Sequence, residues 1–469
     1  MRIAPVAVAA AIIIPSLTSQ PRAPHLTPAI PAGITGTPSQ RAYDTLGWQL
    51  FVALNWPAKN GEADRSVTIG QAAGAPRVWD FFTDPIDIFK SSSLCPDDKP
   101  SAQNKVLRMA RDNTGSTNGL DIQAGSSWPL VDQRGNFAMV EVVVNGAHRQ
   151  YIESNGLTTM QGIAQFAKQQ RTFRFPTGAM ELKAAWRLFP ADTDPRILAR
   201  YYTRQAIVCV AKEQSRTGQA LRIEGTVGLV GLHIVYKTKD QPRWIWSTFE
   251  QVDNYEVAYK PLPGLTPTFS PGVAPADPNR QPQPPPAAGQ LYQWSATQPT
   301  AGSATPTQAA RCANEPALPS ALNAAWQSAL AAVPDSPWQY YRLNATQWFD
   351  ATDRLHPRNA DGVPVSRNST LETYLLGDQT IAAQVPTIGP VVSRPTIDPP
   401  NSTLADTIVA TIVAASTPKK TGAYTWSNCV VCHQMAMYQF GPDPASRSDS
   451  ILTDDSFIFR SNIRPGDKK

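Results

Sequence analysis

Residues 220–238, ALRIEGTVGLVGLHIVYKT, are the stretch that decides the expected fold of this chain. Val, Ile, Leu and Tyr recur through it, and these residues are typical of β-strands. The length predicts one long strand that bends at Gly225 or Gly228, where the missing side chain allows the backbone to change direction.

Four further β-prone runs surround this stretch. Residues 180–187 alternate apolar and charged side chains, which indicates a strand with one buried face. Residues 201–210 and 243–249 have strand composition, and residues 137–144 form another run, closed by the turn-forming pair Asn145-Gly146. Short strands joined by tight turns predict a largely antiparallel sheet, for which a sandwich is one arrangement.

Helices are expected to flank this sheet, which makes the predicted fold α+β. Ser39 can cap a helix whose apolar residues recur at helical spacing from Tyr43 to Leu54. Shorter helices are predicted over residues 158–170 and 320–333, from the same periodicity.

Composition indicates a globular protein with room for two or three domains. The chain has 469 residues, of which 42% are hydrophobic and 17% charged. Its 44 prolines predict long loops and rigid connectors. We expect five parts: a signal peptide (1–23), a β-rich N-terminal body (24–260), a Pro-rich connector (261–290), a mixed α/β region (291–420) and a C-terminal segment (421–469).

The N-terminus and the charge bear on location and partners. Met1-Arg2 precedes an apolar run over residues 3–14, which is too short to cross a bilayer and has the form of a signal peptide. The protein is therefore expected to be periplasmic or otherwise exported, with membrane contact only if this segment stays uncleaved. A net charge of +5 with no long Lys/Arg stripe argues against nucleic-acid binding.

The chemistry of the chain is concentrated at Cys429-Val430-Val431-Cys432-His433. Two cysteines two residues apart, followed at once by histidine, are the spacing of covalent c-type haem attachment. Each thiol can bond one haem vinyl group, and His433 can then place an imidazole nitrogen under the iron. A redox dithiol and half of a zinc site are the competing interpretations, but neither the βαβ context nor a second ligand pair is visible nearby.

Through Cys429, Cys432 and His433 the last fifty or so residues resemble the c-type cytochromes. More loosely, the whole chain resembles large exported bacterial proteins of the cytochrome c family with one haem and unsettled activity. That looser resemblance is carried by Gly119-Leu120, Trp128-Pro129-Leu130-Val131-Asp132-Gln133, Trp246-Ser247-Thr248-Phe249-Glu250 and Val252-Asp253-Asn254. It implies one covalent haem c and electron transfer, and it names no substrate.

The second ligand of the iron is expected to come from the N-terminal body. Only 36 residues follow His433, and the methionines among them, Met435 and Met437, would lie on the His433 side of the porphyrin. His233 shares a predicted strand face with apolar residues, so it is either a hydrogen-bonded core histidine or a distal ligand. Met180 is expected to pack in the core.

The remaining histidines are assigned to the surface. His25 lies in the Pro-rich leader, His148 follows a predicted turn, and His356 precedes a proline in a polar loop. Two pairs of charges, Glu181 with Lys183 and Glu250 with Asp253, are expected in rim salt bridges or on a solvated face, and the alternative is that either pair lines a pocket.

Three cysteines lie outside the motif. In an oxidising compartment Cys95 and Cys312, both in loop-like sequence, are the preferred disulfide, which leaves Cys209 as a buried thiol. The other pairings stay open.

The sequence thus predicts an exported mono-haem c-type cytochrome that transfers one electron to a redox partner protein. The haem-binding segment is expected to be helical and to span residues 421–469. Two alternatives stay open, a haem-dependent oxidoreductase and a haem-based sensor of a small ligand, because the body is far larger than haem carriage requires.

Overall fold

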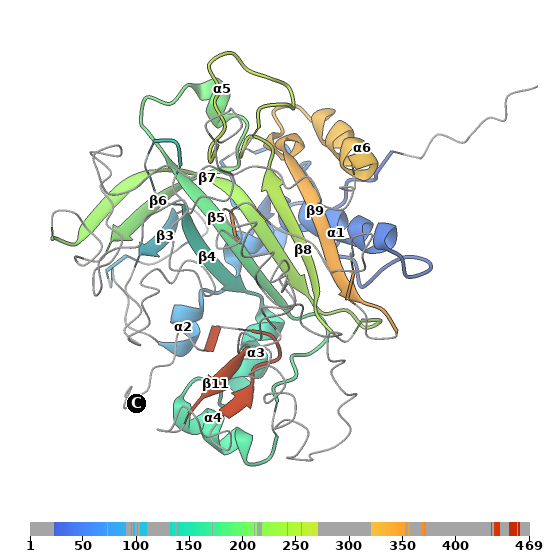
Figure 1. The fold of residues 1–469 in the computed structure, drawn as a ribbon, viewed down its shortest axis with the longest axis vertical. Coiled ribbons are helices and arrows are strands. Elements are labelled where there is room, and N and C mark those ends of the chain that lie inside the picture. The colour runs from blue at the N-terminus through green and yellow to red at the C-terminus, as the bar shows by residue number, and fades with distance from the viewer. Residues whose placement is uncertain are drawn as a thin grey trace, which may run out of the picture.

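The computed structural model places an α+β chain around one curled β-sheet (Figure 1). The structure describes residues 23–72, 74–90, 95, 97–98, 101, 104–109, 132–134, 136, 138–170, 172–210, 212, 218–241, 243–254, 256–270, 320–351, 355–356, 368, 370–371, 433, 436–440, 450–456 and 458–459. Residues 1–22 of the expected signal peptide, most of the Pro-rich connector, and Cys312, Cys429 and Cys432 lie outside these residues.

The long central strand predicted from residues 220–238 is β7 (Leu221–Tyr236). One edge of β7 pairs with β5 (Met180–Phe189). The other edge pairs first with β6 (Thr203–Val210) and then with β8 (Ile245–Gln251). One strand thus organises the sheet, because it is long enough to serve two partners in succession along the same edge.

Four more strands extend the sheet on both sides. β4 (Met139–Val144) pairs with β5, and β9 (Tyr341–Phe349) pairs with β8. The short β10 (Leu355–His356) pairs with β9, and β3 (Asn104–Met109) pairs with β6 in parallel. The pairing of β3 with β6 is the one parallel pair among the described strands of this sheet, so the sheet is largely antiparallel, as predicted. It curls until β3 lies beside β4, and in the described residues it forms one curled sheet rather than a sandwich (Figure 1).

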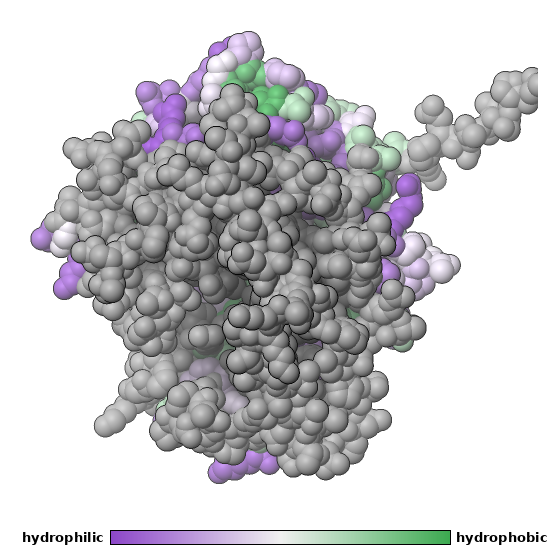
Figure 2. Space-filling model, viewed as in Figure 1, coloured by the Kyte–Doolittle hydropathy of each residue, from purple (hydrophilic) through white to green (hydrophobic). Residues whose placement is uncertain are grey.

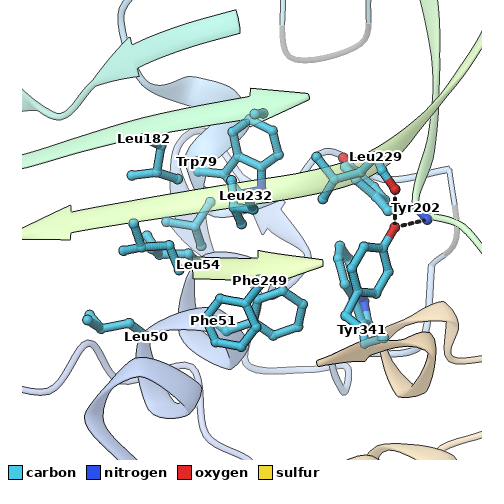
Figure 3. Packing of buried hydrophobic residues seen from close by; sticks show 14 of the residues in the cluster. Leu50, Phe51, Leu54, Trp79, Leu182, Tyr202, Leu229, Leu232, Phe249 and Tyr341 are labelled. Atoms are coloured by element: carbon cyan, nitrogen blue, oxygen red, sulfur yellow. Dashed lines mark hydrogen bonds between the residues drawn. The ribbon is translucent and has the colours of Figure 1, made fainter. Parts of the chain in front are cut away.

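Two helices cover one face of this sheet. Helix α1 (Gln40–Leu54) begins at Ser39, whose hydroxyl accepts a hydrogen bond from Ala42 N, as the sequence predicts. It packs on β8 and β9, and α6 (Ser320–Ala331) lies beside it. Figure 3 shows the interface, where Phe51 of α1 stacks on Phe249 at 4.4 Å between ring centroids.

A buried tyrosine ties the two halves of the sheet together in the same core. The Tyr341 hydroxyl of β9 donates to Leu229 O of β7 at 2.9 Å and accepts from Tyr202 N at 3.0 Å (Figure 3). Both bonds satisfy backbone groups near the point where β7 changes its partner from β6 to β8. The Tyr341 hydroxyl thus supplies hydrogen bonds to backbone groups at the point where strand pairing is interrupted.

Shorter elements complete the described chain. They are β1 (Ala58–Lys59), β2 (Glu62–Ala63), the 3-10 helices η1 (Val78–Phe81) and η3 (Pro337–Tyr340), α2 (Pro85–Phe89), α3 (Gly146–Ser154), α4 (Met160–Ala167), α5 (Pro195–Leu198), β11 (Met437–Gln439) and β12 (Ser450–Leu452). Asn145 does not form the predicted hairpin turn, since its side chain caps α3 by accepting from His148 N at 3.1 Å. In the ranges that the structure describes, no helix is long and apolar enough to span a bilayer.

The described surface in Figure 2 is mainly hydrophilic, with a small hydrophobic area at the end of the molecule where α5 lies. Ile197 and Leu198 of α5 are only partly buried, against a small core cluster. Scattered apolar residues of this kind are normal on a folded chain.

Candidate functional site

His433 is held by a hydrogen bond that fixes its protonation. Its Nδ1 lies 2.6 Å from the carbonyl oxygen of Asp455. A carbonyl oxygen only accepts, so Nδ1 carries the proton. In the neutral imidazole this tautomer puts the acceptor lone pair on Nε2, which is the form in which histidine coordinates metals.

The carbonyl that holds His433 belongs to a tight, buried turn formed by residues 453–456. Asp454 and Asp455 both have left-handed backbones, with φ of 50° and 65°. Aspartate tolerates this conformation better than most residues, although it still costs free energy. The turn is closed by Ser456 N, which donates to Thr453 O at 3.1 Å, and by Thr453 Oγ1, which donates to Ser456 O at 2.6 Å.

The β body binds this turn through a buried ion pair. Lys237, just after β7, places Nζ 2.6 Å from Asp454 Oδ2, and the Phe175 backbone N–H donates to the same oxygen at 2.8 Å. Trp244 Nε1 donates to the Asp454 carbonyl at 2.7 Å. Burial raises the pKa of Asp454, and the charge of Lys237 opposes that rise.

A second polar contact holds the end of the turn. Ser456 Oγ donates to Glu181 Oε2 of β5 at 2.7 Å. Burial raises the pKa of Glu181 to about 7, even though the Ser456 hydroxyl and Lys183 lower it. The expectation that Glu181 lies on a solvated rim is therefore wrong, because the C-terminal turn covers it.

Apolar packing accompanies these polar contacts. β11 and β12 form an antiparallel pair beside α3 and α4 (Figure 1). Their side chains and the following residues join a cluster with the sheet and with the segment before β5. The cluster includes Tyr438, Ile451, Ile458, Phe459, Phe173, Phe175, Val235, Trp244 and Trp246. The described part of the C-terminal segment thus contains strands, where the sequence predicted only helix.

His233 lies on the same face of the sheet as this docked segment. In β7 it is two residues from Val235, a member of the apolar cluster, and it is paired with Lys183 and Thr248 across the neighbouring strands. Because side chains alternate along a strand, His233 and Val235 point to one face. His233 is buried, as predicted.

Residues 368 and 370 contact the strand neighbours of His233. Asn368 Nδ2 donates to Thr248 Oγ1 at 2.9 Å, and Thr370 lies so close to Gly231 that a Cβ there would be 1.9 Å from its hydroxyl. This close approach explains why glycine stands at residue 231.

The structure also shows where Met180 and two other histidines lie. Met180 is buried in the core on the opposite face, as predicted. His25 is exposed, as predicted. His148 is not at the surface: it is fully buried against Phe175, with ring centroids 3.9 Å apart, because α3 turns it inward. Burial lowers the pKa of His148 to about 3.

His356 and the second charged pair also differ from expectation. His356 is half-buried, stacks on Trp348 at 4.7 Å, and has Nε2 3.0 Å from Asp350 Oδ2. Glu250 and Asp253 are both buried and paired with arginines rather than solvated. The tertiary fold brings those arginines, Arg342 and Arg200, from distant parts of the chain.

The cysteines correct one further expectation. Cys95 and Cys209 form the disulfide, with Cα atoms 6.3 Å apart, so Cys209 is no free thiol and Cys95 does not pair with Cys312. Asp98 lies near both sulfurs, within 4.8 Å between donor atoms. A disulfide offers no thiolate, so these three residues are not a metal site while it stays oxidised.

A buried charge cluster is the largest feature that the sequence did not reveal. Lys105 Nζ of β3 lies 2.8 Å from Asp80 Oδ1 and 2.9 Å from Glu141 Oε1 of β4. Trp186 Nε1 donates to Glu141 Oε2 at 3.1 Å, and the Lys105 ammonium lies 4.2 Å from the centre of the Trp79 ring. One feature of the sequence indicates such a cluster: Glu141 is a charged residue inside the apolar run 139–144.

Lys105 is stabilised in its charged form by two carboxylates. Burial lowers the pKa of Lys105, but Asp80 and Glu141 outweigh this and raise it overall. Lys105 therefore stays protonated and joins β3 to β4, two strands that share no ladder. The cluster closes the curl of the sheet, and its burial argues for structure rather than catalysis.

Comparison with known proteins adds no family to this description, since no protein-family model, no curated protein and no solved structure matches the chain.

Proposed function

We propose that this chain is an exported mono-haem c-type cytochrome that transfers one electron to a redox partner protein. The proposal rests on the spacing of Cys429, Cys432 and His433, joined to one observation, the bond from His433 Nδ1 to the Asp455 carbonyl. Ligating histidines almost always donate their second ring N–H to a carbonyl, carboxylate or water, which fixes the ring and raises its basicity.

In this proposal each residue has a separate task. Cys429 and Cys432 would hold haem c through thioether bonds, and His433 would ligate the iron through Nε2. Bound haem would supply a one-electron iron couple. The chain itself orients the imidazole, keeps the proton on Nδ1, and buries the supporting turn away from water.

The second ligand is proposed to come from the β body. His233 is a buried histidine on the sheet face where the segment that carries His433 docks. A ligand from this position would tie the haem to the body and favour electron transfer over binding of an external molecule.

The test is covalent attachment. The chain is produced in a bacterial host that attaches c-type haem in its periplasm, and the haem that survives denaturation is measured. We expect one haem per chain in the wild type and none in the Cys429→Ser/Cys432→Ser variant. The matched control Cys312→Ser should keep its haem, and a wild type without covalent haem would sink the proposal.

Ligation of the iron is tested by carbon monoxide. If His233 is the second ligand, carbon monoxide leaves the visible spectrum of the reduced wild type unchanged. The spectrum of reduced His233→Ala then shifts when carbon monoxide is added. A wild type that itself binds carbon monoxide would reject His233 as a tight ligand and move the assignment toward an oxidoreductase or sensor.

A further inference from the structure

We propose that Glu181 and Lys237 of the β body are positioning residues for His433, which they reach through the turn at residues 453–456. This inference rests on the proposed function for its haem readout. Its structural part concerns only contacts within the chain.

The first step is the continuity of the contacts. Three successive residues of the turn each bind a different group: Asp454 binds Lys237, the Asp455 carbonyl binds His433, and Ser456 binds Glu181. The two anchors from the body thus flank the carbonyl that orients the imidazole. A displacement of either anchor must move that carbonyl, because peptide geometry fixes the distance between neighbouring residues.

The second step is the conformation of the turn. Two consecutive left-handed aspartates are unfavourable without external support. Support comes mainly from the body: Asp454 Oδ2 accepts from Lys237 and from Phe175 N, and its carbonyl accepts from Trp244. The turn therefore keeps this shape only while it is docked, and the His433 tautomer depends on docking.

The third step is burial. The side chains of Lys237 and Asp454 are 7% and 8% exposed, so their attraction is little screened by water. Glu181 and Ser456 are buried as well. An interaction of this kind is sensitive to the loss of one partner, in contrast to an ion pair on the surface.

As a consequence, contacts from the sheet control how strongly the His433 imidazole donates electrons to the iron. A strong Nδ1–H bond makes the imidazole a better electron donor and stabilises the oxidised iron. Loosening the turn weakens that bond, and the reduction potential of the haem rises.

The experiment uses nitrogen-15 NMR of the histidine rings together with redox titration. The wild type should show His433 as a single Nδ1-protonated tautomer. In the haem-free Cys429→Ser/Cys432→Ser background, where Nε2 is not bound to iron, Lys237→Met and Ser456→Ala should convert it to a mixture of tautomers. In the haem-loaded chain the same substitutions should raise the midpoint potential. Lys239→Met, an exposed lysine two residues away, is the matched control and should change neither.

Lys237→Met and Ser456→Ala differ in how much they disturb the fold. Lys237→Met leaves Asp454 without its cation and can impair folding, whereas Ser456→Ala removes only the hydroxyl that donates to Glu181. Glu181→Gln, which still accepts from Ser456, should keep the tautomer, and Glu181→Leu should lose it. A single Nδ1 tautomer retained by both Ser456→Ala and Glu181→Leu in the haem-free background would overturn the inference.

Failure of the proposed function gives a different result. If the purified chain carries no haem, only the tautomer measurement applies, and a mixture in Ser456→Ala still supports the positioning role. If haem is present, and the variants change neither the potential of the loaded chain nor the tautomer of the haem-free chain, the positioning role is wrong and the haem assignment stands.

Discussion

Substitution of Lys105 by methionine tests the buried charge cluster most sharply. Lys105 is 3% exposed and has two carboxylate partners, at 2.8 and 2.9 Å. Removing one member of a buried ion pair typically costs ~3–5 kcal/mol, because an uncompensated charge stays in the interior. We expect Lys105→Met to lower the free energy of unfolding by about that amount at pH 7.

The pH dependence of this loss identifies its cause. Asp80 keeps Arg204, 4.0 Å away, and the Tyr202 hydroxyl. Among the described residues Lys105 is the cation that pairs with Glu141, so without it Glu141 will take up a proton. A carboxyl with a raised folded pKa makes folding more favourable as the pH falls toward its unfolded pKa, by up to ~1.4 kcal/mol per pH unit. The deficit of the variant should therefore shrink between pH 7 and 5.

Urea unfolding followed by tryptophan fluorescence measures both effects. Lys59→Met is the matched control, because Lys59 also pairs with an aspartate, Asp64 at 2.7 Å, but is 76% exposed. Its effect should stay within ~1 kcal/mol. A Lys105→Met variant as stable as this control at pH 7, with no dependence on pH, would refute the account of the cluster.

Three further predictions concern single elements. His148→Phe should remove a loss of stability on acidification. The folded pKa of about 3 lies below the unfolded pKa near 6.5, so stability that is present above pH 6.5 is lost as the pH falls, and from pH 6.5 to 4.5 the wild type should lose ~2.3 kcal/mol relative to the variant in urea titrations. Cys95→Ser/Cys209→Ser opens a loop with a sequence separation of 114, and calorimetry should show a loss of ~2–5 kcal/mol. Gly47→Ala places a Cβ 2.6 Å from Thr346 Oγ1, so α1 must move off the sheet at a cost of ~1–3 kcal/mol in urea unfolding.

Each of these has an outcome that contradicts it. Identical pH profiles for wild type and His148→Phe would show that the histidine is charged in the fold. Non-reducing peptide mapping that links Cys95 to Cys312 would reject the disulfide. Gly74→Ala meets no atom within 4 Å, so Gly47→Ala must cost more than this control.

The sequence predicts secondary structure correctly where interactions between residues close in the chain determine it. The Ser39 cap, the α1 periodicity and the strand that begins at Met180 are all set by neighbours within a few residues, and all three elements are confirmed. The one-sided burial expected of that strand is wrong, because both of its faces are buried. Met180 and His233 were assigned to buried strand positions on the same ground, and they are buried.

Long-range contacts account for what the sequence did not predict. The parallel pairing of β3 with β6 joins segments about a hundred residues apart, and loop-rich sequence before β3 gives no sign of it. Asn145 has the composition of a hairpin turn and of a helix cap, and the tertiary fold selects the cap. Glu181 looked solvated because its partner, Ser456, lies 275 residues away.

Part of the candidate site was predictable and part was not. The motif at His433 follows from chemistry at fixed spacing, whereas the Asp455 carbonyl that holds its ring is a backbone group and leaves no trace in side-chain composition. Lys237 and Asp454 are likewise paired only by the docking of the C-terminal turn.

The central claim is that His433 serves a haem bound covalently through Cys429 and Cys432. The most direct measurement is the reduced visible spectrum of the purified chain after unfolding in alkaline pyridine, with haem quantified against protein. The account predicts a c-type haemochrome at one haem per chain that stays with the polypeptide. A colourless chain, or haem that separates from it on unfolding, would contradict the account.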